Sequence, residues 1–342
     1  MTQVRSAEDG MLDGRKILVT GGAGFIGSHL VERLVDLGAQ VTSLDYQPPV
    51  GLQNLLSVLD QIDRIDLDLV AGDVEGLFRD SGYQLVFHLA GSAHVQSSVE
   101  DPQRDFERNA LATLRLLEAL RRTSPQTALI YASSAVVYRG GGSALISEDD
   151  PTAPGSPYGV SKLASERYVS VFSQLYGLRT GIARLFTVYG PRLRKQIIFD
   201  IVGRLTKDQV TLPMLGDGTQ MRDFTYIADV VDALILMAQN APLKGEAYNV
   251  ASGEQVTVDA LARMIGHAMG LSPTLVYSGE VYTGDTSHWF ADISRLRALG
   301  YEQKVTLVEG IGRTVDWISR DLSGSRSTGA ALAAGTLRDP QH

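Results

Sequence analysis

Residues 16–30 read KILVTGGAGFIGSHL, and this stretch decides the fold. The apolar run KILVT predicts a fully buried strand, and the pattern from Phe25 to Leu37 predicts a helix. Between them, Gly21 permits a tight turn, Gly24 lets the backbone approach a pyrophosphate, and Gly27 lets the helix pack closely on the strand. The N–H groups at the start of the helix would face the phosphates. The stretch therefore predicts a dinucleotide-binding turn.

The first half of the chain repeats this alternation of strand and helix. Further strands are predicted at residues 41–44, 65–70, 85–89 and 128–131, and a strong amphipathic helix at 109–122. Apolar strands that lack a two-residue period are typical of parallel sheets covered by helices on both faces. We therefore expect an α/β fold with a doubly wound parallel sheet.

The second half is less regular and predicts a smaller α/β cap. Helices are expected at 156–175, 197–205, 229–239, 259–270 and 308–320, and a strand at 179–185. We expect a leader at 1–14, a dinucleotide-binding domain at 15–185 with later segments crossing back, and a cap at 186–320. The Gly- and Ser-rich tail, 321–342, is predicted to be disordered.

Composition excludes several classes of protein. The 342 residues carry a net charge of −8, which argues against a nucleic-acid or anionic-membrane partner. Because the chain has no cysteine, disulfides, thiolate catalysis and cysteine-based metal sites are excluded, and no metal is expected. No signal peptide and no apolar run of about 18 residues is present. We expect a cytoplasmic protein.

Asp45 ends the second predicted strand, about 20 residues beyond the glycines, where a carboxylate binds the adenosine ribose hydroxyls. A carboxylate would repel a 2′-phosphate, and no basic residue follows before Arg64. The sequence thus favours NAD over NADP. Asp73 follows the third strand, where it would either lie near the adenine or serve as a turn residue.

Tyr158 and Lys162 stand four residues apart in the helix predicted at 156–175, so they share one face. An ammonium group near a phenol, helped by a nicotinamide charge, lowers the phenol pKa and produces a possible base. Ser134 ends a strand at the carboxyl edge of the sheet, where ligands bind in such folds. Its hydroxyl would bond a substrate oxygen, while Ser133 would support either the nicotinamide or the local backbone.

In combination, these motifs resemble the extended short-chain dehydrogenase/reductase superfamily, and more narrowly the NAD-dependent nucleotide-sugar epimerase/dehydratase family. The resemblance covers about residues 15–320. It also rests on HLAGSAHV at 88–95, NALATLRLLEA from Asn109, RLFTVYGPR at 184–192 and GDGTQMRDFTYIADVV at 216–231.

The resemblance implies a Rossmann-type sheet with permanently held NAD, and a cap that binds a nucleoside diphosphate sugar. It assigns Tyr158 as base and acid, Lys162 to the nicotinamide ribose and Ser134 to the sugar. The implied cofactor residues are Gly21, Gly24, Phe25, Ile26, Gly27, Asp45, Asp73, Val74, Leu89, Ala90, Gly91, Asn109, Ser133, Tyr158 and Lys162. The implied substrate residues are Ser98, Ser134, Thr187, Arg192, Arg222 and Asp285.

Two further expectations follow from the resemblance. Arg222 would meet the diphosphate as a charge-assisted donor, the alternative being an ion pair with a nearby aspartate. A homodimer would form through the helices that begin near Asn109 and Ser156.

The chain departs from the family pattern at three positions. Tyr282 stands where many UDP-sugar members carry an arginine, so the identity of the bound nucleotide stays open. Thr187 stands where many members have asparagine, and Arg139 follows Tyr138 where glycine is usual. A surface role is the simplest interpretation of Arg139, and contact with a substrate carboxylate is the alternative.

Ala135 and Val136 narrow the range of reactions that the chain can be expected to catalyse. Dehydratases of the family have an Asp–Glu pair there, because eliminating water needs an acid and a second base. Neither Ala135 nor Val136 can move a proton, so a 4-epimerase acting by transient oxidation at C4 is expected. The alternatives are a 4-keto reductase or dehydrogenase acting on a GDP- or dTDP-sugar, and a catalytically idle protein that senses NAD or a nucleotide sugar.

Overall fold

The structure, a computed structural model, describes residues 11–46, 51–138, 145–280 and 290–334, with side chains as far as residue 323. The chain divides into two compact units. The first contains residues 1–188, 223–255 and 286–304, and the second contains residues 189–222, 256–285 and 305–342. The segments that cross back after residue 188 are thus 223–255 and 286–304.

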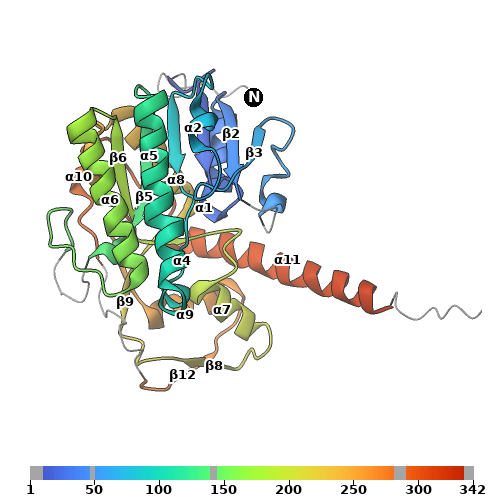
Figure 1. The fold of residues 1–342 in the computed structure, drawn as a ribbon. Helices are drawn as coiled ribbons and strands as arrows, with labels where there is room; N and C mark the ends of the chain where they lie inside the picture. Colours follow the sequence, from blue (N-terminus) through green and yellow to red (C-terminus); the bar gives the residue numbers. More distant parts are fainter. Residues whose placement is uncertain (1–10, 47–50, 139–144, 281–289, 335–342) are drawn as a thin grey trace, which may run out of the picture. The chain divides into compact units, whose positions relative to one another are not determined.

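The first unit is built on a seven-stranded sheet (Figure 1). Its strands are β1 (Lys16–Thr20), β2 (Gln40–Asp45), β3 (Asp63–Asp66), β4 (Leu85–His88), β5 (Ala128–Ser134), β6 (Thr180–Leu185) and β10 (Lys244–Val250). The spatial order is β10-β6-β5-β4-β1-β2-β3, and all neighbours run parallel. The predicted doubly wound parallel sheet is confirmed. The order reverses between β1 and β4, and ligands of such sheets bind at the carboxyl ends of the strands beside this point.

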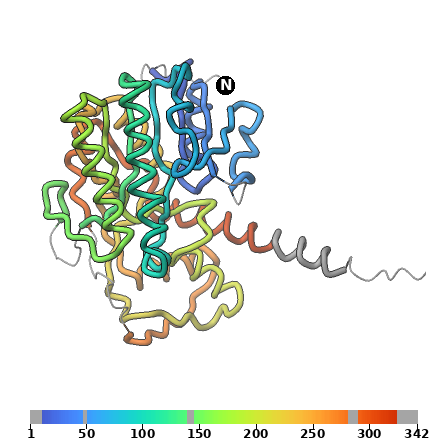
Figure 2. The backbone as a smooth tube through the Cα atoms, in the orientation of Figure 1, coloured from blue at the N-terminus to red at the C-terminus, as the bar shows by residue number. Residues whose placement is uncertain are grey.

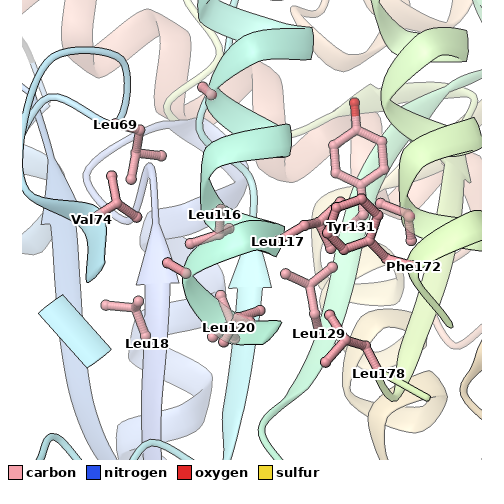
Figure 3. Packing of buried hydrophobic residues seen from close by; sticks show 14 of the residues in the cluster. Leu18, Leu69, Val74, Leu116, Leu117, Leu120, Leu129, Tyr131, Phe172 and Leu178 are labelled. Atoms are coloured by element: carbon pink, nitrogen blue, oxygen red, sulfur yellow. The ribbon is translucent and has the colours of Figure 1, made fainter. Parts of the chain in front are cut away.

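Helices cover the sheet. α2 (Val74–Phe78), α5 (Ala112–Thr123) and α6 (Pro157–Tyr176) lie side by side, and α1 (Phe25–Asp36) packs against α8 (Ile227–Asn240). The buried cluster in Figure 3 joins Leu18 of β1 and Leu129 of β5 to Leu117 of α5 and Phe172 of α6. This apolar layer fixes the helices on the sheet through the hydrophobic effect.

Local signals set the ends of α6. The Ser156 hydroxyl accepts a hydrogen bond from the Gly159 N–H, and Pro157 is the first helical residue. Gly177 ends the helix in the left-handed conformation, with φ of 71°. These caps place Tyr158 in the first turn, next to the carboxyl edge of the sheet.

Shorter elements complete the first unit. They are η2 (Leu52–Leu55), α3 (Val95–Glu100), α4 (Pro102–Phe106), the π-helical turn η3 (Glu107–Leu111), η4 (Ala135–Val137) and α10 (Ser294–Arg297). Three short strands, β7 (Thr187–Tyr189), β9 (Met221–Tyr226) and β11 (Gln255–Thr257), lie where the chain passes between units and form a small sheet of their own.

The second unit is mostly helical. α7 (Gln196–Leu205), α9 (Val258–Ala268) and α11 (Leu307–Ala334) pack on one another, and β8 (Thr211–Met214) pairs with β12 (Thr274–Tyr277) in parallel. Figure 2 follows the backbone of this unit from yellow to red. None of the helices in the described parts of the chain is both long and apolar enough to span a membrane.

The predicted extent of the ordered fold needs correction at both ends of the chain. Leu12 is buried and the Gly14 N–H donates to Gly38 O at 2.9 Å, so the fold begins by residue 11 and not at 15. α11 continues to Ala334, so residues 321–334 are helical where disorder was predicted. The run ALAA at 331–334 has high helix propensity, which the Gly and Ser content of the tail obscured.

Candidate active site

The glycine turn after β1 is tightly packed. Gly21 has φ of 74°, and a Cβ added to it would lie 2.9 Å from Ala90 N. A Cβ on Gly27 would lie 2.0 Å from Gly21 O. Gly24 is exposed at the start of α1, whose first turn begins with Phe25 and Ile26 and carries no acidic residue. The arrangement fits a dinucleotide, because it presents free N–H groups without side chains in front of them.

Asp45 ends β2 beside this turn, as predicted. Its carboxylate accepts hydrogen bonds from the Ala23 N–H at 3.1 Å and from the Ser43 hydroxyl at 2.8 Å. Burial raises the pKa of Asp45, while these hydrogen bonds lower it. The side chain thus ties the turn to β2, at the position from which the sequence predicts a contact with the ribose.

Gly91 and Asn109 meet at the carboxyl edge of β4. A Cβ on Gly91 would lie 2.4 Å from Asn109 Oδ1. Asn109 is buried in the π-helical turn η3 and donates from Nδ2 to Asp105 Oδ1 at 3.1 Å. Within the described residues, Asn109 Oδ1 and Asp105 Oδ2 have no hydrogen-bond partner. A π-turn with two unsatisfied buried acceptors is typical of a functional site.

The backbone at Leu89 and Ala90 is held by Thr20. Thr20 O accepts from the Leu89 N–H at 3.1 Å, and Thr20 Oγ1 accepts from the Ala90 N–H at 3.2 Å. Thr20 Oγ1 also shares a 2.7 Å hydrogen bond with His88 Nδ1. Burial lowers the pKa of His88 to about 3, so the ring is neutral and serves as a fixed partner.

Ser134 and Tyr158 come together at the carboxyl edge of the sheet. The Ser134 hydroxyl lies close enough to the Tyr158 phenol to influence its pKa, although Tyr158 lies in α6 and Ser134 ends β5. Burial raises the pKa of Tyr158 to about 12, while the Ser134 hydroxyl lowers it and the charge of Asp105 raises it. The expected lowering by Lys162 is not among these causes, so the chain by itself keeps the phenol protonated.

Lys162 follows one turn later and is buried. Its Nζ donates to Ala132 O at 2.9 Å and lies 4.9 Å from the centroid of the Tyr131 ring. Burial lowers the pKa of Lys162 to about 8, because water is excluded from the ammonium group. The three predicted catalytic side chains therefore lie within one cluster of the first unit.

A family model for the NAD dependent epimerase/dehydratase family matches residues 17–251. The chain belongs to this family. The resemblance found in the motifs is therefore confirmed, and so is the prediction of NAD as the cofactor.

Individual relatives agree with this family. The UDP-glucose 4-epimerase of Mycolicibacterium smegmatis is 34% identical over 314 residues, which is 88% of this chain and 98% of the relative. A UDP-N-acetylglucosamine 4-epimerase from Methanobrevibacter ruminantium, solved with UDP-N-acetylmuramic acid, has a TM-score of 0.83 and 30% identity, covering 90% of this chain and 99% of that one. The UDP-glucuronic acid 4-epimerase from Bacillus cereus, solved with its substrate and NAD, has a TM-score of 0.80 and 32% identity, covering 89% and 99%.

Two serines with expected ligand contacts have other partners in this family member. The buried Ser133 hydroxyl donates to Glu166 Oε1 at 2.5 Å. The buried Ser98 hydroxyl donates to Val95 O and accepts from the Tyr158 N–H at 3.1 Å. These bonds give Ser133 the local support that the sequence named as an alternative, and they tie Ser98 to α6; the contacts of Ser133 with the nicotinamide and of Ser98 with the sugar stay predictions.

Asp73 has the turn role that the sequence left open. Its carboxylate caps α2 by accepting from the Gly76 N–H at 2.9 Å. Val74 is buried in the core, where Figure 3 shows it beside Leu69. Their contacts with the adenine stay predictions.

The residues that are predicted to bind the substrate near its diphosphate lie on segments other than β5 and α6. Thr187 begins β7 in the first unit, whereas Arg192 and Arg222 belong to the second. Arg222 Nη1 donates to Met221 O at 2.9 Å, and the neighbouring Asp223 accepts from Ser252 and Gly253. Their substrate contacts stay predictions, and Asp285, with Arg139 and Tyr282, lies outside the described residues.

Sequence reasoning missed four buried residues of this region. Asp105 and Glu166 each stand four residues from a predicted site residue, Asn109 and Lys162, and this helical spacing was the available signal. Tyr131 and His88 stood in strands, and nothing in their pattern marked Tyr131 as a neighbour of Lys162 or His88 as a partner of Thr20.

Proposed function

We propose that the protein is an NAD-dependent UDP-sugar 4-epimerase. The observation that carries the proposal is the position of Ser134 beside Tyr158 and the buried Lys162, at a strand end that continues with Ala135 and Val136. This set can move one proton to and from one hydroxyl. Reversible oxidation at a single carbon requires no more than that from the protein.

The same segment argues against 4,6-dehydration. Ala135 and Val136 form the short turn η4, in which the Val136 N–H donates to Ser134 Oγ at 3.4 Å. Eliminating water from C5 and C6 needs an acid and a second base near the sugar, and neither side chain can act as one. Oxidation and re-reduction at C4 are therefore favoured over elimination.

In the proposed reaction, Tyr158 removes the proton of the C4 hydroxyl and Ser134 holds that oxygen. When bound, NAD supplies the hydride acceptor and donor and a positive charge that favours the phenolate. Lys162 would bind the nicotinamide ribose, and the turn at Gly21, Gly24 and Gly27 would hold the pyrophosphate. After the 4-keto sugar has turned over, Tyr158 returns the proton. Arg222 and Arg192 would hold the diphosphate during the rotation.

UDP is proposed because the similar proteins named above act on or bind UDP-sugars. To test the reaction, purified protein without added NAD is incubated with UDP-glucose, UDP-N-acetylglucosamine, UDP-glucuronate, and GDP- and dTDP-sugars. Proton NMR should show inversion at C4 of at least one UDP-sugar. A stable keto product, or no change in any of these sugars, would contradict the proposal.

We also propose a homodimer in which the helices α4, α5 and α6 of two copies pack together. The outer face of α6 carries Val160, Tyr168, Val171 and Leu175, all exposed, at spacings that keep them on one side of the helix. Phe106 of the adjoining α4 is exposed as well. An apolar patch of this kind on a single chain is typical of an interaction surface.

The double change Val171→Asp and Leu175→Asp is expected to convert a dimer to a monomer, because the charges would be buried at the contact. Light scattering after size-exclusion chromatography measures the mass. Val276→Asp, at an equally exposed apolar residue of β12, is the control that should stay dimeric. A monomeric unmodified protein would refute the homodimer.

A further inference from the structure

A buried ion pair lies directly behind the catalytic residues. Glu166 in α6 and Arg184 in β6 are 3% and 5% exposed. Arg184 Nη2 donates to Glu166 Oε2 at 2.8 Å, and Arg184 Nε lies 3.0 Å from Oε1. Glu166 Oε1 also accepts from the Ser133 hydroxyl at 2.5 Å. Both carboxylate oxygens are therefore bonded from fixed directions.

The other side of Arg184 is equally well bonded. Its Nη1 donates to Tyr138 Oη at 2.7 Å and to Glu148 O at 3.0 Å, and the guanidinium lies 4.8 Å from the centroid of the Tyr138 ring. Tyr138 Oη donates to Asn249 Oδ1 at 2.8 Å. Asn249 donates in turn to two backbone carbonyls. The network thus connects α6, β6, β10 and the chain on both sides of η4.

Such a network is not explained by stability alone. Burying two charges costs much of what their attraction gains, and apolar residues of similar volume often stabilise a fold as well. A fully bonded polar network does, however, fix one geometry, because every donor and acceptor in it is held by directional bonds from several elements.

Two successive residues at the end of β5 bond to α6, and the next one, Ser134, lies beside Tyr158. Ala132 O accepts from Lys162 Nζ, and the Ser133 hydroxyl donates to Glu166. The second of these bonds is anchored by Arg184. A shift of β5 along α6 would break both bonds and would move Ser134 relative to Tyr158.

We propose that Ser133, Glu166 and Arg184 are positioning residues, which clamp the end of β5 against α6 so that Ser134 and Lys162 stay aligned with Tyr158. The proposal rests on the 4-epimerase function. Small displacements of reacting groups are costly: a misplacement of about 1 Å can reduce a rate about a hundredfold. Without the clamp, Ser134 is free to leave Tyr158.

Ser133→Ala tests the clamp most mildly, because it removes one hydroxyl and no charge. We expect kcat to fall roughly tenfold with KM and bound NAD unchanged. The acidic limb of kcat/KM should move to higher pH, because the nearby Ser134 hydroxyl lowers the pKa of Tyr158. The other charged groups near the phenol, Asp105 and Lys162, are present in this variant.

Ser170→Ala is the matched control. Ser170 lies in the same helix and ties it to the sheet by donating to Gly245 O at 2.6 Å, one turn beyond Glu166. It should lower the melting temperature by a similar amount but leave kcat and the pH profile as in the unmodified protein. Equal kcat and equal pH profiles for Ser133→Ala and Ser170→Ala would overturn the inference.

A paired variant separates positioning from stability. Glu166→Leu with Arg184→Met removes both buried charges, so neither is left unpaired and the fold should be retained. We expect near-normal melting and NAD content but a kcat still lowered at least tenfold. Full activity in this variant would overturn the clamp. Absence of turnover in the unmodified protein would instead contradict the proposed function, and the inference with it.

Discussion

Replacing Tyr158 by phenylalanine is expected to lower turnover by about a thousandfold while leaving NAD bound. General acid–base catalysis contributes roughly 10²–10⁴ to a rate, and here a single phenol both takes and returns the C4 proton. The ring fills the same volume in both variants, so the buried site keeps its packing. The Ser134 hydroxyl keeps its bond from the Val136 N–H and can still bond the sugar oxygen.

The measurement compares kcat by NMR with the NAD released from denatured protein. Tyr176→Phe, an exposed tyrosine of the same helix, is the matched control and should keep full activity. A Tyr158→Phe protein that inverts C4 at a normal rate would eliminate Tyr158 as the base. Loss of both turnover and NAD would instead indicate a structural role.

Turnover should also rise with pH. The pKa of Tyr158 is about 12 in the chain alone, mainly because the phenol is buried. The active form is the phenolate, so kcat/KM should increase with pH until the phenol of the loaded enzyme is deprotonated. Bound NAD carries a positive charge that favours the phenolate. The pH at which kcat/KM stops rising should therefore lie below the pKa of Tyr158 in the chain alone.

The second large effect is expected from Gly27→Ala, which should abolish NAD binding. The added Cβ would lie 2.0 Å from Gly21 O and 2.8 Å from Gly22 Cα, and both are backbone atoms. They can move away only by distorting the turn that faces the pyrophosphate. We expect affinity for NAD to fall at least a hundredfold, or about 3 kcal/mol.

Calorimetric titration with NAD after removal of the resident cofactor measures this loss. Gly203→Ala is the control, because a Cβ on this α7 glycine meets nothing within 4 Å. It should bind NAD normally and gain slightly in stability, since alanine favours the helix. Circular dichroism establishes that Gly27→Ala is folded. Stoichiometric NAD in purified Gly27→Ala would show that the packing of this turn does not govern binding.

The central sheet and the closeness of Tyr158 to Lys162 could be predicted from the sequence for physical reasons. Buried parallel strands have unpatterned apolar runs, and a helix brings residues such as Tyr158 and Lys162 onto one face. The end of the third strand was harder to predict. Its apolar run suggested residues 65–70, but β3 stops at Asp66 and the Val70 N–H is held by Asp68 Oδ1 at 2.7 Å.

Partners distant in the sequence could not be predicted. Ser133 was ambiguous between a cofactor contact and local support, and its acceptor, Glu166, stands 33 residues away. Arg184 becomes a partner of Glu166 only because β6 is placed beside β5. Local patterns identify elements, whereas pairing between elements depends on the packed sheet.

Isotopic labelling at C4 tests the central claim most directly. The UDP-sugar that the protein inverts is prepared with deuterium at C4 and incubated in ordinary water without added NAD. If C4 is oxidised and reduced again within one bound complex, the inverted product will retain its deuterium at C4. Loss of the label to solvent, or inversion that requires added NADH, would contradict the account.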